Sequence, residues 1–211
     1  MTYEQSVLLT GSQWTGLSEE RKLEVLQTIE NHSAFETGRF SCPVVGKFLY
    51  TGTDGVVLGT YDPKNQVIYV NSSQLASDSR YGKDSEAIVT ACLHEGRHAY
   101  QHQVTDGTVL HDNQSEANAW KENLAEGNYI SFRDNPRAYY NQPVEVDARR
   151  FAEEKYSEII AERQSHDIES YSGLALREVF EQQLSDEGTD EAQRAASFQQ
   201  TEKETNAISI A

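Results

Sequence analysis

The sequence predicts an α+β fold in which a small strand and hairpin sheet packs on two longer helices. Three segments lead to this prediction. Residues 39–70 carry short apolar runs separated by glycines, a pattern typical of strands and turns. Residues 85–103 have apolar side chains at helical spacing, and Pro143 is well placed to begin a second long helix, which we expect to end near Arg163.

A first helix is expected from Ser18 to about Ile29. Ser18 is a favourable N-cap, Glu19 and Glu20 suit the first turn, and a stripe of leucine and isoleucine follows. Because serine caps and acidic first turns both stabilise helix N-termini, this beginning is well specified.

The stretch from Gly59 to Asn71 is typical of a hairpin. The run Asp62-Pro63-Lys64-Asn65 forms its turn, and Val67–Val70 is the clearest strand of the chain because of its β-branched and aromatic residues. We therefore expect this strand to belong to the sheet beside the long helices.

The remaining elements are shorter. Asp84 or Ser85 caps the helix over residues 85–103, and Ser115 is expected to cap a short helix from Glu116 to Ala125. The stretch from 133 to 142 is expected to be irregular, and a last helix covers residues 174–184. We expect one domain over residues 1–185, followed by a polar, mobile tail over residues 186–211.

Composition narrows the classes of partner. The chain has 211 residues and a formal net charge of -16, so it has no electrostatic reason to bind nucleic acid or an anionic membrane. It has no apolar run of the about 18 residues that a membrane span needs. The N-terminus lacks the pattern of a secretory signal, so we expect a cytoplasmic protein or one exported without a cleavable signal peptide. Of the two cysteines, Cys92 is expected in the core, and a disulfide with Cys42 is not required.

The most informative motif is His94-Glu95-Gly96-Arg97-His98. Residues four apart share one helix face, so both imidazoles can bind a single ion. Glu95 points to the side, where a carboxylate can serve as general base without being a ligand. This is the HExxH arrangement of zinc-dependent hydrolases.

Catalytic zinc takes a third protein ligand. His102 lies too far along the helix, about 12 Å from His94 at 1.5 Å per residue. The long metzincin pattern is excluded, since its glycine and third histidine would fall on Gln101 and Val104.

The remaining candidates for the third ligand are Asp106, His111, Glu116 and Glu145. Glu145 is favoured because small apolar residues follow it along the helix, at Ala148 and Ala152. A helix with such a face can pack closely on the motif helix and bring the carboxylate to the metal.

The motif together with Pro-Val-Glu-Val-Asp-Ala-Arg-Arg-Phe-Ala from Pro143 resembles the gluzincin metallopeptidases. The chain is most similar to compact bacterial zincins such as the anthrax lethal factor catalytic domain group and the phage-repressor-cleaving metallopeptidases. The resemblance covers roughly residues 59–155, and it implies a zincin-like fold with Val67–Val70 as the edge strand that aligns the substrate.

The resemblance also implies roles for individual residues. It implies that Zn²⁺ is bound by His94, His98 and Glu145, and that Glu95 is the general base. It further implies that Tyr139 or Tyr140 stabilises the oxyanion, and that Asp147 orients a ligand histidine from the second coordination shell.

We therefore expect a zinc metalloendopeptidase of narrow specificity that acts on a protein or peptide substrate, either a regulatory protease or a toxin-like effector. The sequence leaves an inhibitor or immunity partner unidentified. The alternatives are a non-catalytic binding protein with structural zinc, which would not need Glu95, and a metal-free domain. Trp120 and Tyr129 are expected in the core or a cleft wall. Arg97 is expected to face away from the metal, in an ion pair or in solvent.

Overall fold

The computed structural model describes residues 6–50 and 56–167. The chain divides into two units, Met1–Arg163 and Gln164–Ala211. In the second unit only residues 164–167 are described, and they are helical. The expected helix over residues 174–184 and the expected tail over residues 186–211 lie outside the described residues.

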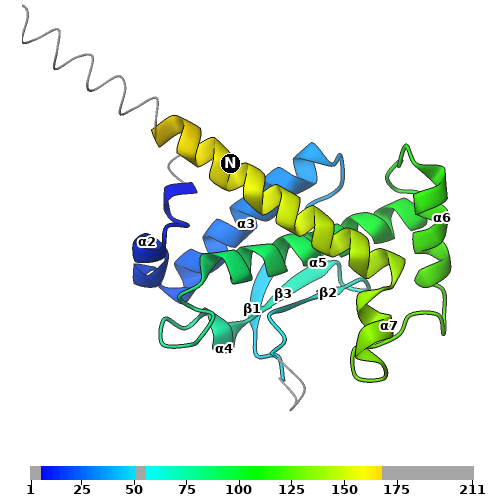
Figure 1. The fold of residues 1–211 in the computed structure, drawn as a ribbon, viewed down its shortest axis with the longest axis horizontal. Coiled ribbons are helices and arrows are strands. Elements are labelled where there is room, and N and C mark those ends of the chain that lie inside the picture. The colour runs from blue at the N-terminus through cyan, green and yellow to red at the C-terminus, as the bar shows by residue number, and fades with distance from the viewer. Residues whose placement is uncertain (1–5, 51–55, 168–211) are drawn as a thin grey trace, which may run out of the picture. The chain divides into compact units, whose positions relative to one another are not determined.

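The described part of the first unit is mostly helical (Figure 1). Its labelled helices are α2 (Gly11–Gly16), α3 (Glu19–Glu36), α4 (Ser72–Leu75), α5 (Ser85–Thr105), α6 (Gln114–Asn123) and α7 (Pro136–Tyr140). A further long helix, drawn in yellow, begins at Pro143 and covers residues 143–163 of this unit; we refer to it as the Pro143 helix.

Three strands form one mixed sheet in the order β1-β3-β2. They are β1 (Val44–Lys47), β2 (Gly59–Asp62) and β3 (Val67–Asn71). β2 and β3 form the expected hairpin, whereas β1 runs parallel to β3. The expectation that Val67–Val70 is an edge strand is wrong. Its backbone is paired on both sides, and β2 is the edge strand of the hairpin.

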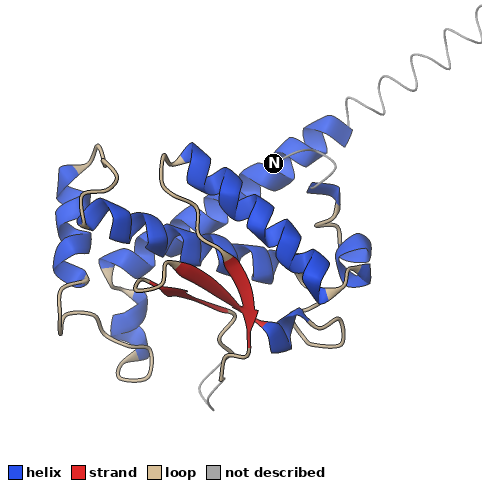
Figure 2. Cartoon of the chain, turned by 180° about the vertical axis from the view of Figure 1, so that it is seen from behind, coloured by secondary structure: helices blue, strands red, loops and turns tan. Residues whose placement is uncertain are grey.

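One hydrophobic core joins the helices and the sheet. α3 and α5 pack on the strands from one side (Figure 2), and the core contains Leu26, Ile68 and Ile88, each fully buried. The Pro143 helix adds Ala148 and Ala152, which are buried as expected for close packing on α5. The predicted α+β architecture is therefore present.

Several element boundaries differ from the expectation. Ser18 is the N-cap of α3, as predicted, and its side chain accepts a hydrogen bond from the Arg21 amide. The helix continues beyond Ile29 to Glu36, because buried Ser33 and Ala34 extend its packed face.

Two other helices begin where the sequence did not predict a start. Asn113, rather than Ser115, is the N-cap of α6. The stretch expected to be irregular contains α7, which is capped by Asn135. In both cases an asparagine side chain bonds the third backbone amide of the turn, so the capping residue is one that local sequence favours as strongly as serine.

A buried ion pair between Glu30 and Arg39 lies next to Gly96 of the motif helix. The guanidinium of Arg39 donates two hydrogen bonds of 2.6 Å to the Glu30 carboxylate, and both side chains are almost inaccessible to solvent. A Cβ atom on Gly96 would lie 2.8 Å from both charged groups. The glycine of the motif therefore allows α5 to approach this pair.

Cys42 and Cys92 are both buried free thiols. Within residues 6–50 and 56–167, no helix combines the length and apolar character that crossing a membrane would require.

Candidate metal centre

The side chains of His94, His98 and Glu145 converge on one point. The two Nε2 atoms are 3.1 Å apart, and Glu145 oxygens lie 3.2 Å from His94 Nε2 and 3.4 Å from His98 Nε2. Ligand atoms at about 2.0–2.1 Å from a tetrahedral zinc ion would be separated by about 3.3–3.4 Å. The three groups therefore already have the spacing of a zinc site.

Two helices bring these groups together. α5 places His94 and His98 one turn apart, with their rings 4.7 Å apart and edge to face. The Pro143 helix carries Glu145 in its first turn, and its small buried residues let it lie against α5. Helical periodicity positions the histidines, and helix packing positions the carboxylate.

The chemistry of the three groups fits a cation. Glu145 has a side chain only 1 % exposed, and its Oε2 is buried without a hydrogen-bond donor. Its Oε1 accepts a 2.7 Å hydrogen bond from the Tyr129 hydroxyl. Oε2 is thus the oxygen left to bind a metal beside His94 Nε2, and a buried carboxylate of this kind requires a positive partner.

The pKa values of Glu145 and His98 show that each group stabilises the charged form of the other. Burial alone would raise the pKa of Glu145, but the His94 and His98 imidazoles, 3.2 and 3.4 Å from its oxygens, hold it well below its usual range. Burial alone would lower the pKa of His98, but the Glu145 carboxylate raises it to about 9. A proton on the imidazoles and a metal ion compete for this negative charge.

Glu95 borders the centre and is held by the edge of the sheet. Its Oε2 accepts a 2.8 Å hydrogen bond from the backbone amide of Tyr61 in β2. Its negative charge contributes to the raised pKa of His98 and of Tyr139. A Cβ on Gly59 would lie 3.1 Å from Glu95 Cγ, so the glycine lets β2 and Glu95 approach each other.

The tyrosines divide into two groups. Tyr139 is partly buried beside Glu145; burial and that carboxylate raise the pKa of its phenol, which keeps the hydroxyl protonated. Tyr140 is 48 % exposed and packs against the Arg149 guanidinium. Tyr129, expected only as core or cleft wall, contacts Glu145 directly. Nothing in the local sequence indicates this contact, because it depends on the path of the chain after α6.

Asp147 does not contact a ligand histidine directly, which differs from its expected role. Its carboxylate accepts hydrogen bonds from Arg97 at 2.7 and 3.1 Å and from Gln101 at 2.8 Å. Gln101 in turn contacts His98 Nδ1 at 2.9 Å. The sequence signal for this contact is spacing, since Gln101 follows His98 by three residues and both therefore lie on one helix face.

The other ligand candidates lie elsewhere. Glu116 pairs with His111 at 3.0 Å and with Arg150 at 3.3 Å. His102 packs on the ring of Tyr61 at 5.5 Å, and Asp106 caps the end of α5. Within the described residues, only His94, His98 and Glu145 form a metal-binding group of three.

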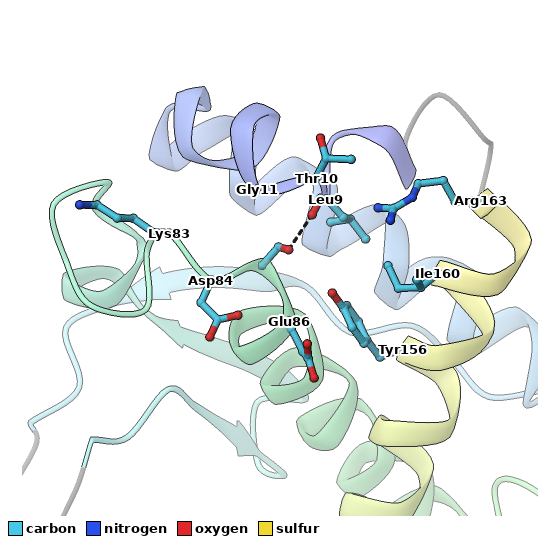
Figure 3. Close-up of a pocket in the computed structure, with 10 residues that line it drawn as sticks. Leu9, Thr10, Gly11, Lys83, Asp84, Glu86, Tyr156, Ile160 and Arg163 are labelled. Carbon is cyan, nitrogen blue, oxygen red and sulfur yellow. Dashed lines mark hydrogen bonds between the residues drawn. The ribbon is translucent and has the colours of Figure 1, made fainter. Parts of the chain in front are cut away.

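A pocket of about 530 Å³ lies at the N-terminal end of α5. It is lined by Leu9, Tyr156 and Arg163, with Asp84 and Glu86 at the helix start (Figure 3). Ser85 also lines the pocket, and its hydroxyl donates a hydrogen bond to the Leu9 carbonyl. None of the metal-centre residues lines this pocket, so it is separate from the candidate chemistry.

Comparison with models of protein families, with curated proteins and with solved structures finds no match for this chain.

Proposed function

We propose that this protein is a zinc-dependent metallopeptidase of the gluzincin type with a zincin-like fold. The observation that carries the proposal is the convergence of His94, His98 and Glu145, with Glu95 next to His94 on the same helix and its carboxylate held by the Tyr61 amide. A structural zinc site has no use for this additional carboxylate, whereas hydrolysis needs a general base there.

A zinc ion held by these three side chains would lower the pKa of a water molecule and polarise a substrate carbonyl. Glu95 accepts a proton from the attacking water and passes it to the leaving amine. The Tyr61 amide holds the Glu95 carboxylate in position while it does so. This bond also leaves the second carboxylate oxygen of Glu95 available for proton transfer.

Tyr139 is the favoured donor to the oxyanion. Its phenol is kept protonated by burial and by Glu145, and a protonated hydroxyl aimed at developing negative charge stabilises the transition state. Tyr129 is already engaged with Glu145 Oε1, so it orients the ligand. Tyr140 is exposed and packs against Arg149, so it is the less suitable donor.

The open edge of β2 is suited to hold an extended peptide. The Asn71 amide donates to the Leu58 carbonyl, so the backbone groups of Leu58 point toward β3. Because the N–H and C=O groups of successive residues in an antiparallel strand point to opposite sides, those of Gly59 and Tyr61 point toward the open edge. The carbonyls of these two residues can accept hydrogen bonds from a substrate strand. This assigns substrate alignment to β2 in place of β3.

The proposal is tested with Glu95→Gln. The purified protein and the variant are loaded with zinc, and cleavage of a complex peptide mixture is followed by mass spectrometry. We expect the variant to retain about one zinc per chain and to lose 10²-fold to 10⁴-fold in rate, since it lacks the general base. Glu86→Gln, an exposed change on the same helix, is the matched control and should cleave like the unchanged protein.

The outcomes separate the alternatives. Zinc binding with no cleavage by the unchanged protein would support a non-catalytic zinc-containing binding protein. Full activity of Glu95→Gln with zinc bound would refute the mechanism. Absence of metal after zinc is offered would leave a domain in which the motif has no metal role.

A further inference from the structure

We infer that Gln101 is a positioning residue of the metal centre, which fixes the ring of His98 and joins it to the helix that carries Glu145. The inference rests on the proposed metal site. Gln101 lies on α5, is fully buried, and makes three side-chain contacts of 2.8–2.9 Å.

The neighbours of the Gln101 amide allow only one orientation of this group. Its nitrogen lies 2.9 Å from the Val144 carbonyl and 2.8 Å from Asp147 Oδ2. Both partners are acceptors, and an amide nitrogen carries two protons, so each proton has one acceptor. The reverse orientation would place the amide oxygen against two other oxygens. The amide is therefore locked with Oε1 facing His98.

The orientation of the Gln101 amide fixes the tautomer of His98. Oε1 of Gln101 is only an acceptor, and it lies 2.9 Å from His98 Nδ1. Nδ1 must therefore carry a proton. In the neutral ring this leaves the lone pair on Nε2, the atom that faces His94 and Glu145. Gln101 thus presents the correct nitrogen to the metal.

Two arginines hold the Asp147 carboxylate in place. Arg97 donates to both of its oxygens, and Arg150 adds a bond of 3.1 Å to Oδ1. Arg97 is itself packed on the rings of Tyr100 and Phe151, at 4.4 and 4.8 Å. The arginine inside the motif therefore anchors the carboxylate that orients Gln101.

These bonds also connect the two ligand-bearing helices. Gln101 and Arg97 belong to α5, whereas Val144 and Asp147 flank Glu145 on the Pro143 helix. The network therefore sets the distance between the histidines and the carboxylate as well as the His98 tautomer. Its loss should weaken metal binding without removing any ligand.

The test compares Gln101→Met with Gln103→Met. Gln103 is a buried glutamine on the same helix whose amide bonds the backbone of Phe40, remote from the ligands. Zinc affinity is measured by competition with a chelator, at a temperature where thermal unfolding shows every variant folded. We expect Gln101→Met to bind zinc 10-fold to 100-fold more weakly, the usual cost of losing such a partner, and Gln103→Met to bind as tightly as the unchanged protein.

Gln101→Glu keeps the length of the side chain but replaces the amide nitrogen by an oxygen that faces the Val144 carbonyl and Asp147 Oδ2. Because both of these groups are acceptors, this variant should not restore the affinity lost in Gln101→Met. A second readout is the exchange of the His98 Nδ1 proton with water in the zinc-loaded protein, followed by nuclear magnetic resonance. Exchange should be slow in the unchanged protein and in Gln103→Met, and fast in Gln101→Met.

Equal zinc affinities for Gln101→Met and Gln103→Met would overturn the inference while leaving the proposed function intact. Fast exchange of the His98 Nδ1 proton in the unchanged protein would overturn it without any variant. If the unchanged protein binds no zinc, the proposed function itself fails, and the inference fails with it.

Discussion

At the scale of single residues, the Glu145 carboxylate distinguishes this centre from a pair of helical histidines. We predict that Glu145→Ala loses stoichiometric zinc, because the two imidazoles retain no third ligand within the described residues. Glu116→Ala is the matched control, since Glu116 pairs with His111 and Arg150 instead. Elemental analysis of the purified proteins measures both. Zinc retained in the first variant and lost in the second would identify Glu116 as the ligand.

Tyr139 and Tyr140 are expected to differ in their effect on catalysis. Tyr139→Phe should lower kcat about 10²-fold to 10³-fold with zinc retained, because one donor to the oxyanion is lost. Tyr140→Phe should have no effect, since that ring lies against Arg149 and solvent. Steady-state kinetics on a cleaved peptide tests the pair, and the opposite ranking would assign the role to Tyr140.

At the scale of elements, the contact between α5 and the Glu30–Arg39 pair depends on Gly96. We predict that Gly96→Ala lowers the free energy of unfolding by about 1–3 kcal/mol, because the added methyl group lies 2.8 Å from both charged groups and forces them apart. Gly16→Ala, where the added atom meets nothing within 4 Å, serves as the control. Denaturant unfolding measures both, and equal stabilities would show that α5 accommodates the methyl group.

The approach of β2 to α5 gives a separate prediction. Gly59→Ala adds an atom 3.1 Å from Glu95 Cγ and 3.4 Å from the Tyr69 carbonyl. The strand or the Glu95 side chain must therefore shift. We expect kcat to fall while zinc affinity is unchanged, because no ligand is touched. A parallel fall in zinc affinity would show that β2 also supports the histidines.

At the scale of the whole molecule, buried acidic groups make folding depend on pH. Burial would raise the pKa of Asp147, but hydrogen bonds from Arg97 lower it below its ordinary value. Because the folded pKa lies below the unfolded value, Asp147 stabilises the protein fully above about pH 4 and loses this contribution as the pH falls toward the folded pKa.

We predict that the free energy of unfolding of Asp147→Asn at pH 7 is about 3 kcal/mol lower than that of the unchanged protein, because Arg97 is left buried without its partner. The difference should shrink as the pH falls below 4. Asp134→Asn, on the exposed surface, should be neutral at every pH. Denaturant unfolding between pH 3 and pH 7 tests this, and a difference that stays constant with pH would contradict the assigned linkage.

Short-range patterns explain which parts of the fold were predictable. The Ser18 cap, the β2–β3 hairpin and the start of the Pro143 helix follow from residues within a few positions of one another. The order of the strands did not, because β1 pairs with β3 across more than twenty residues. The amino-acid composition of a strand does not determine how many other strands pair with it.

The sequence by itself determined the helix that carries His94, Glu95 and His98, and it selected Glu145 as the favoured third ligand. These rest on helical periodicity and on small residues that permit close packing. Tertiary structure alone decided the convergence of the carboxylate with the imidazoles. It also decided the contacts of Tyr129 with Glu145, of Tyr61 with Glu95, and of Gln101 with Asp147. The physical reason is that hydrogen bonds and charges act over a few ångströms, and only packing brings distant segments that close.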